Sequence, residues 1–202
     1  EIKGVNSEIS VVVVNDASSA QIIDEYQNTE NIKSIEIINM KENRGHARCI
    51  ASGLKYIFEK KEFDFVIPMD GDGEDRPEEI KEFIQLADQS EDKSIVGERV
   101  KRSEGLFFQL CYLFHKFLTL SFTGQSIKFG NFTCLSKATV EKMLKEKASW
   151  NSFSGSLKKI EKDLLAIPSV RGTRYFGPSK MSFINLLKHS LSIISVFRKT
   201  VL

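Results

Sequence analysis

The stretch Phe63–Glu78, FDFVIPMDGDGEDRPE, decides the fold of this chain. Its apolar run, Phe63–Met69, predicts a buried strand that delivers Asp70 and Asp72 to the strand's tip. Together with Glu74, these carboxylates offer hard oxygen ligands that suit Mg²⁺ or Mn²⁺, and such a cation binds a diphosphate well. Asp-Gly-Asp is also ordinary turn chemistry, so the triplet alone does not distinguish a site from a turn.

Strands and helices alternate on both sides of this stretch. The other predicted strands are Ile9–Val14, Ile35–Asn39 and Ser94–Gly97, and the predicted helices are Ala20–Gln27, Gly45–Lys60 and one that begins at Pro77. This alternation predicts an α/β fold with a mostly parallel sheet and helices on both faces. Ligands of such sheets bind at the carboxyl ends of the strands. Asp16, Asn43 and Asp70 all fall at or just after such ends, which indicates a site there.

The composition is that of one globular domain of 202 residues, with 41% hydrophobic and 28% charged residues. The three cysteines, Cys49, Cys111 and Cys134, lack metal-ligand or redox spacing, which favours reduced thiols in a cytoplasmic setting. Residues 1–98 carry 11 Lys/Arg and 22 Asp/Glu, whereas residues 99–202 carry 18 and 5. The basic second half indicates an anionic partner, either a phosphate, a nucleic acid or a membrane surface, unless it is a solvated basic face.

Two apolar segments of the second half, Leu106–Phe122 and Ser182–Phe197, are interrupted by polar and basic residues. The first is slightly short and too polar for a membrane span. Each segment fits either a buried core helix or an amphipathic helix that lies in a membrane interface. We favour the interfacial interpretation for both.

Five motifs, in the same order, resemble those of the family 2 glycosyltransferases with the GT-A fold. They are Val11–Ser18 (VVVVNDAS), Asn43–Gly53 (NRGHARCIASG), Val66–Glu78 (VIPMDGDGEDRPE), Val96–Arg99 (VGER) and Arg174–Met181 (RYFGPSKM). The last is similar to the Arg-x-x-Gly-x-Ser-Lys motif of the branch that transfers hexoses to polyprenyl or dolichyl phosphate. The resemblance implies one GT-A domain over residues 1–202, in which residues 1–98 bind the nucleotide-sugar and residues 99–202 face the acceptor and the membrane.

The resemblance also implies a role for each matching residue. Asp16, Asn43, Gly45, Asp70 and Arg99 would bind the nucleotide-sugar; Asp70, Asp72 and Glu74 would hold the metal; Arg174, Ser179 and Lys180 would bind a phosphate; and Asp72, Arg174 and Lys180 would be catalytic. Charge builds on the leaving diphosphate in the transition state, where a cation and basic side chains stabilise it, and arginine grips phosphate bidentately. A solvated basic turn is the alternative for Arg174 and Lys180.

The implied reaction is an inverting transfer of a hexose from a UDP- or GDP-sugar, at the cytoplasmic face of a membrane, to polyprenyl phosphate or a cell-envelope glycan. The family's Asp-x-Gly-Asp-Phe-Arg stretch reads here Lys128–Thr133 (KFGNFT), so Asn131 replaces a carboxylate. A sugar hydroxyl needs a base, whereas a phosphate monoester, with a second pKa of about 6, is already ionised near neutral pH. We therefore expect a phosphate acceptor, faced by Asn131 and by Trp150–Ser154, unless the latter is a loop with one buried tryptophan.

Three further departures from the family pattern affect these expectations. Asn15 replaces the first Asp of the usual pair, which leaves the preferred base open, and Arg76 replaces a proline whose role Pro77 still fills. The apolar strand with which family members begin does not precede Glu1. Without that strand, neighbouring strand edges would be unpaired, and we expect low stability or a homo-oligomer.

Three alternative functions compete with this one. A sugar nucleotidyltransferase typically carries a Gly-rich basic loop after its first strand, which this sequence lacks. A non-catalytic nucleotide-sugar-binding module is consistent with the missing carboxylate at Asn131, and it would bind UDP and a metal without turnover. Nucleic-acid binding rests on the basic half alone, with no recognition motif, and we do not expect it.

Overall fold

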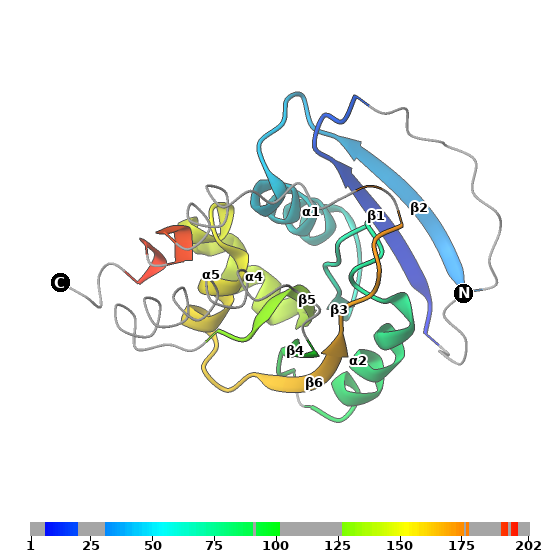
Figure 1. Cartoon of the computed structure of the whole chain (residues 1–202), viewed down its shortest axis with the longest axis vertical. Coiled ribbons are helices and arrows are strands. Elements are labelled where there is room, and N and C mark those ends of the chain that lie inside the picture. The colour runs from blue at the N-terminus through cyan, green and yellow to red at the C-terminus, as the bar shows by residue number, and fades with distance from the viewer. Residues whose placement is uncertain are drawn as a thin grey trace.

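The computed structural model describes residues 7–19, 31–90, 92–101, 127–175, 177, 191–193 and 195–197. Its strands form two sheets (Figure 1). In the first sheet β1 (Ile9–Asn15) runs parallel to β2 (Ile32–Asn39), and the two strands end in register, with Asn15 opposite Asn39. Both strands are rich in β-branched residues, which favour a pleated surface, and both predicted strands are confirmed.

The second sheet has four strands in the order β3-β5-β4-β6. These are β3 (Phe65–Val66), β5 (Phe129–Ser136), β4 (Ile95–Lys101) and β6 (Leu165–Val170). Strands β4 and β6 are parallel, whereas β5 runs antiparallel to both β3 and β4. The α/β class is confirmed, with sheets that are mixed in the described part of the chain. Strands β5 and β6 are additions that the sequence pattern does not indicate.

Strand β3 is much shorter than the predicted run Phe63–Met69. Its two residues pair with Leu135 and Ser136 at the end of β5. Pro68 has no N–H to donate to a ladder, so the run leaves the sheet before the acidic residues are reached. The expectation that Asp70 lies at the tip of the strand is therefore corrected, because it lies in the loop beyond that tip.

Helices cover both faces of the four-stranded sheet, as predicted (Figure 1). The helices are α1 (His46–Lys60), α2 (Ile80–Ala87), α4 (Lys137–Lys145) and α5 (Phe153–Ile160), with 3₁₀ turns η1 (Pro77–Glu79) and η2 (Lys147–Trp150). The helix predicted from Pro77 thus begins as a 3₁₀ turn before it continues as α2. Helix α1 also contacts β1, and Gly53 allows this close approach, since a Cβ there would lie 3.0 Å from Val14 Cγ2.

Two apolar cores lie on opposite faces of that sheet. One contains Leu54, Val66, Val96, Leu135, Val140, Met143, Phe153 and Leu157, and the other contains Phe83, Ala87, Ile95, Phe132, Cys134 and Ile167. Side chains alternate along a strand, so neighbours such as Ile95 and Val96 enter different cores. The sheet is thereby fixed between α1, α4 and α5 on one face and α2 on the other.

A polar network centred on Glu161 ties β4 to α4 and to the end of α5. The Glu161 carboxylate accepts hydrogen bonds from the Ser94 N–H at 2.9 Å, the Ser94 hydroxyl at 2.8 Å and the Thr139 hydroxyl at 3.0 Å. Ser136 caps α4 by accepting from the Thr139 N–H at 3.3 Å. Ser94, Ser136 and Thr139 are buried, so these hydrogen bonds satisfy groups that have little access to water.

Part of the predicted organisation lies outside the described residues, namely Ala20–Gln27, Leu106–Phe122 and most of Ser182–Phe197. At the end of the last segment, Ile193, Val196 and Phe197 are buried and pack with Ile127 and Ala148. These three side chains therefore contribute to a core, in contrast to the interfacial interpretation that we favoured. Among the helices described, none has the length and apolar character needed to cross a membrane.

The two sheets keep separate hydrogen-bond ladders. Within the described ranges β1 pairs with β2 alone, and β3 pairs with β5 alone. Low stability or self-association of the chain stays a prediction.

Candidate functional site

The acid loop, residues 70–75, follows β3 and is shaped by its own carboxylates. The Asp75 carboxylate accepts a hydrogen bond from the Asp70 N–H at 2.8 Å, and the Asp72 carboxylate accepts one from the Glu74 N–H at 3.0 Å. Gly73 has a φ of 90°, a backbone angle that residues other than glycine rarely adopt. The sequence DGDGED thus folds into a tight turn that carries four carboxylates.

A basic segment, residues 171–175, follows β6 and lies against the acid loop. Arg174 Nη2 donates to Asp72 Oδ2, and Arg171 Nη2 donates to Glu74 Oε2. Arg174 Nε also lies 3.4 Å from Glu74 Oε1. The structure therefore brings together Asp72, Glu74 and Arg174, all three of which the sequence marked as site residues.

Backbone contacts hold these two segments together independently of the charges. The Gly172 N–H donates to the Glu74 carbonyl oxygen at 2.8 Å, and the Tyr175 N–H donates to the Asp72 carbonyl oxygen at 2.9 Å. A Cβ on Gly172 would lie 2.3 Å from the Gly73 carbonyl oxygen, and a Cβ on Gly73 would lie 2.8 Å from the Tyr175 ring. Only glycine at both positions permits this approach.

Asp75 is the buried member of the acid loop, with 8% of its surface exposed. Burial raises its pKa from 3.8 to about 6, and the nearby charges of Asp70 and Asp72 act in the same direction. The hydrogen bond from the Asp70 N–H and the positive charge of Arg99 oppose this rise. Arg99, on β4, therefore belongs electrostatically to the same site.

Arg99 reaches this position across a glycine of the neighbouring strand. A Cβ on Gly130 of β5 would lie 3.1 Å from Arg99 Nη2. The next residue, Asn131, stands where the family has a carboxylate and is half-buried on β5. Lys128, at the start of that segment, pairs with Glu98 at 3.0 Å.

A second polar group lies at the carboxyl ends of β1 and β2. The Asp16 carboxylate accepts hydrogen bonds from the N–H groups of Arg44 at 2.7 Å and Gly45 at 2.8 Å, and Asn43 Nδ2 donates to the Asp16 carbonyl oxygen at 3.1 Å. Gly45 has a φ of 85° and immediately precedes α1. Asp16, Asn43 and Gly45 are thus brought together as predicted, although their contact with a nucleotide stays a prediction.

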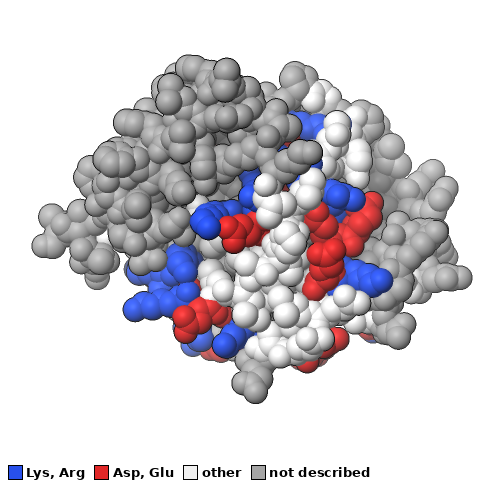
Figure 2. Space-filling view, turned by 60° about the horizontal axis from the view of Figure 1, so that its bottom comes forward, with Lys and Arg blue, Asp and Glu red and all other residues white. Residues whose placement is uncertain are grey.

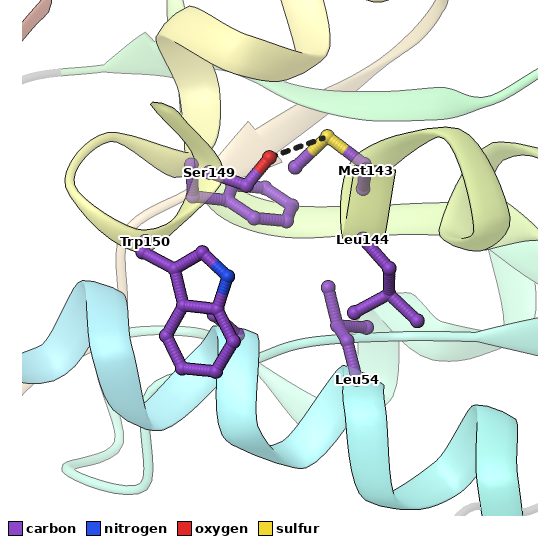
Figure 3. Close-up of a pocket in the computed structure, with 7 residues that line it drawn as sticks. Leu54, Met143, Leu144, Ser149 and Trp150 are labelled. Atoms are coloured by element: carbon purple, nitrogen blue, oxygen red, sulfur yellow. Dashed lines mark hydrogen bonds between the residues drawn. The ribbon is translucent and has the colours of Figure 1, made fainter. Parts of the chain in front are cut away.

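Trp150 lies elsewhere. Figure 3 shows its indole at an apolar pocket with Leu54, Met143 and Leu144, and the Ser149 hydroxyl points to Met143 Sδ at 3.9 Å. The pocket lies between α1, α4 and η2, and its lining contains no charged side chain. This placement favours the alternative of a packed tryptophan over an acceptor-facing one. Ser179 and Lys180 lie outside the described residues.

The charge division between the two halves of the sequence is partly an internal pairing. Arg171, Arg174 and Lys137 of the second half pair with Glu74, Asp72 and Glu62 of the first. Figure 2 accordingly shows acidic and basic side chains next to one another on one face of the described part. Burial lowers the pKa of Arg171, although Asp72 and Asp70 raise it, and the guanidinium remains charged.

Asp70, Asp72 and Glu74 supply carboxylate oxygens of the kind that a divalent cation binds. In the arrangement described, however, Asp72 and Glu74 are paired with arginine, and the described residues include no group of three His, Cys, Asp or Glu side chains that could hold a metal ion. The residues as arranged do not fit a bound cation, and the Mg²⁺ or Mn²⁺ expectation stays a prediction.

Arg171 is the site residue that sequence reasoning missed. It lies three residues before Arg174, in a tail that has no acidic residue after Asp163. Its partner Glu74 is 97 positions away, so no local pattern marks the pair. Its place directly after β6, which ends at Val170, gave no signal either, because the sequence pattern does not indicate that strand.

Comparison with known proteins gives one family match and relatives of one kind. Glycosyl transferase family 2 matches residues 5–147. An undecaprenyl-phosphate 4-deoxy-4-formamido-L-arabinose transferase of Proteus mirabilis (strain HI4320) is 26% identical over 201 residues, which cover 92% of this chain and 56% of the relative. An enzyme of the same name from Photorhabdus laumondii subsp. laumondii is 29% identical over 201 residues, with 92% and 57% covered. The chain spans little more than half the length of these curated relatives.

Proposed function

Because this chain belongs to glycosyl transferase family 2, and so has the GT-A fold, we propose that it transfers a sugar from a nucleotide-diphosphate sugar to the phosphate of a polyprenyl phosphate. The observation that carries the proposal is the acid loop held against two arginines. Asp72 and Glu74 meet Arg174 and Arg171, with Arg99 close by. Such a group of guanidinium side chains suits a diphosphate, which arginine binds bidentately.

The donor is proposed to lie along the carboxyl ends of the strands. Asp16, Asn43 and Gly45 would contact the nucleoside of a UDP- or GDP-sugar, and Asp70 would contact its ribose. Arg99 and Arg174 would contact the diphosphate. This assignment is supported by the family match and by the two polar groups at the ends of β1, β2 and β3.

The acceptor is proposed to be a lipid phosphate. Both relatives are named for transfer to undecaprenyl phosphate. Asn131 supplies no carboxylate to deprotonate a hydroxyl, which favours an anionic acceptor that needs no base. The basic second half would also suit a membrane surface, and we propose peripheral association at the cytoplasmic face.

The chemical step is a direct displacement. A phosphate oxygen of the acceptor forms a bond to the anomeric carbon, the bond from that carbon to the diphosphate oxygen breaks, and the nucleoside diphosphate leaves with the bonding electrons. The configuration inverts because attack and departure occur on opposite faces. Arg174, Arg171 and Arg99 would stabilise the charge that accumulates on the leaving group.

Transfer of a labelled sugar tests the proposal. The purified chain is incubated with radiolabelled UDP- and GDP-sugars and undecaprenyl phosphate in detergent, and label is counted in the organic phase together with release of nucleoside diphosphate. Undecaprenol, which lacks only the phosphate, is the matched acceptor control. Label should enter the lipid with undecaprenyl phosphate and not with undecaprenol.

Two results would contradict the proposal. Transfer to a free sugar but not to undecaprenyl phosphate would show that the acceptor is a sugar hydroxyl and not a lipid phosphate. Binding of UDP or GDP by a folded chain, without turnover of any donor, would instead indicate the non-catalytic binding module.

A further inference from the structure

Exposed apolar side chains are concentrated beside the charged residues of the site. Among the described residues, the exposed large hydrophobic side chains are Val13, Met69, Val100, Val170, Tyr175 and Leu191. Four of them adjoin a charged site residue in the sequence: Met69 precedes Asp70, Val100 follows Arg99, Val170 precedes Arg171, and Tyr175 follows Arg174. Met69, Val100, Val170 and Tyr175 are termed the apolar rim.

Two residues of the rim lie on neighbouring strands. Parallel strands β4 and β6 pair Arg99 with Ser169 and Lys101 with Val170, so Val100 is an extra residue in the ladder. Such a bulge leaves its residue unpaired and redirects the side chain, and bulges are frequent next to active sites. Val100 is accordingly 59% exposed, although it lies inside a strand.

Tyr175 borders the same site from the basic segment. Its N–H donates to the Asp72 carbonyl oxygen at 2.9 Å, and its ring lies 2.8 Å from the position of a Cβ on Gly73. The ring is therefore held against the acid loop while the residue stays 63% exposed. Single exposed apolar residues are ordinary on a protein surface, but four beside one charged site indicate a ligand with an apolar part.

Arg99 provides a positive charge next to this rim. Its guanidinium is half-buried and lies over Gly130, where a Cβ would be 3.1 Å from Arg99 Nη2. Within the described ranges Arg99 takes part in no ion pair, whereas Arg171 and Arg174 pair with carboxylates. A half-buried guanidinium of this kind suits an anionic oxygen.

We propose that the apolar rim holds the first isoprene units of a prenyl phosphate, while Arg99 binds the phosphate to which they are attached. A lipid phosphate joins an anion directly to an apolar chain, which is the combination that Arg99 and Val100 present side by side. A free phosphate would leave the rim exposed, and a sugar would need polar partners there. The inference rests on the proposed function, because its ligand is the prenyl end of the proposed acceptor.

The test is equilibrium dialysis of the full chain with radiolabelled farnesyl phosphate, a short prenyl phosphate, without detergent or sugar donor. Val100→Thr and Val170→Thr keep a β-branched side chain but replace a methyl with a hydroxyl, and each should lower the affinity about fourfold. This factor corresponds to about 0.8 kcal/mol, the value for one methylene-sized group, at about 1.4 kcal/mol per tenfold. The affinity for methyl phosphate, which has no chain to reach the rim, should not change.

Val13→Thr is the matched control. Val13 is 38% exposed, close to the 39% of Val170, but it lies in β1 between two other valines. The same exchange there should leave the affinity for farnesyl phosphate unchanged. An equal loss in Val13→Thr, or no loss in Val100→Thr and Val170→Thr, would overturn the rim. If a threonine variant fails to fold by circular dichroism, Met69→Gln replaces it, and an unchanged affinity there overturns the rim equally.

Arg99→Gln tests the charged half of the proposal. It should weaken farnesyl phosphate binding about tenfold and leave the binding of farnesol, which lacks the phosphate, unchanged. Farnesol bound by the wild type as tightly as farnesyl phosphate, or no binding of farnesyl phosphate at all, would overturn the proposal.

Failure of the rim and failure of the transferase function remain separately visible, because the dialysis contains no sugar donor. A chain that binds farnesyl phosphate through the rim but transfers no sugar would keep the rim and lose the transferase. Transfer to undecaprenyl phosphate with the same KM for the lipid in the wild type and Val100→Thr would do the reverse.

Discussion

Replacement of Glu161 by alanine should destabilise the fold by about 3 kcal/mol. The carboxylate accepts three hydrogen bonds, from the Ser94 N–H, the Ser94 hydroxyl and the Thr139 hydroxyl. The two hydroxyls lie 3.1 Å apart and can satisfy one another when the carboxylate is removed. That leaves the Ser94 N–H and one hydroxyl donor without a partner, at about 1.5 kcal/mol each.

Thermal and urea unfolding, followed by circular dichroism, measure this loss. For a chain of this length, about 3 kcal/mol corresponds to a Tm lower by about 6–12 °C. Glu161→Gln should fall about halfway, because an amide keeps one acceptor oxygen and replaces the other with a donor. Glu141→Ala is the matched control. The pair of Glu141 with Lys145 is exposed, so this substitution should cost at most about 0.5 kcal/mol.

The reasoning would be refuted if Glu161→Ala and Glu141→Ala lost the same stability. It would also be refuted if Glu161→Gln were as destabilised as Glu161→Ala, because the graded loss follows from counting acceptors. A larger loss in Glu161→Ala with an unchanged urea m-value would support the network as the junction of β4, α4 and the end of α5.

Three further predictions concern the candidate site. Asp75→Asn should be more stable than the wild type above pH 6, by up to about 3 kcal/mol. The pKa of Asp75 is raised from 3.8 to about 6 in the folded state, so the wild type loses stability as the pH rises through that interval and the amide does not. Equal pH profiles of the unfolding free energy for the two proteins would exclude this. Gly172→Ala should abolish sugar transfer and lower the unfolding free energy in urea by about 1–3 kcal/mol, because its Cβ would lie 2.3 Å from the Gly73 carbonyl oxygen. Transfer and stability equal to those of the wild type would show that the close contact between the acid loop and the basic segment is not needed. Arg174→Lys should retain the fold but lower kcat/KM for transfer at least about tenfold, because a lysine lacks the forked donors; activity within twofold of the wild type would contradict a bidentate role.

The sequence was sufficient for the elements whose signals are local. β1 and β2 are β-branched runs, and α1 follows apolar residues at helical spacing, so these elements could be predicted. β5 could not, because Gly130 and Asn131 interrupt Phe129–Ser136 and Thr133 is its one β-branched residue. It is a strand because β3 and β4 hydrogen-bond to it on both sides, which is a tertiary cause.

The same distinction applies to the site. Asp70, Asp72 and Glu74 could be identified because one short turn carries them all, and Arg174 because it lies in a motif. Arg171 has neither signal, and its role depends on a contact between the loops after β3 and β6. Trp150 is a conspicuous residue type for which the sequence left two interpretations open, and its place beside α1 in an apolar pocket favours the packed one.

Four carboxylates within six residues also explain why the basic segment is needed at all. Asp70, Asp72, Glu74 and Asp75 repel one another, and Asp75 is the one that burial drives toward its neutral form. The remaining charge requires cations, which the second half of the chain supplies as Arg171 and Arg174. An acid loop that served only as a turn would not need four charges, because Asn, Ser and Gly make the same turns without repulsion. Arg171 and Arg174 therefore supply the positive charge that allows these carboxylates to lie so close together.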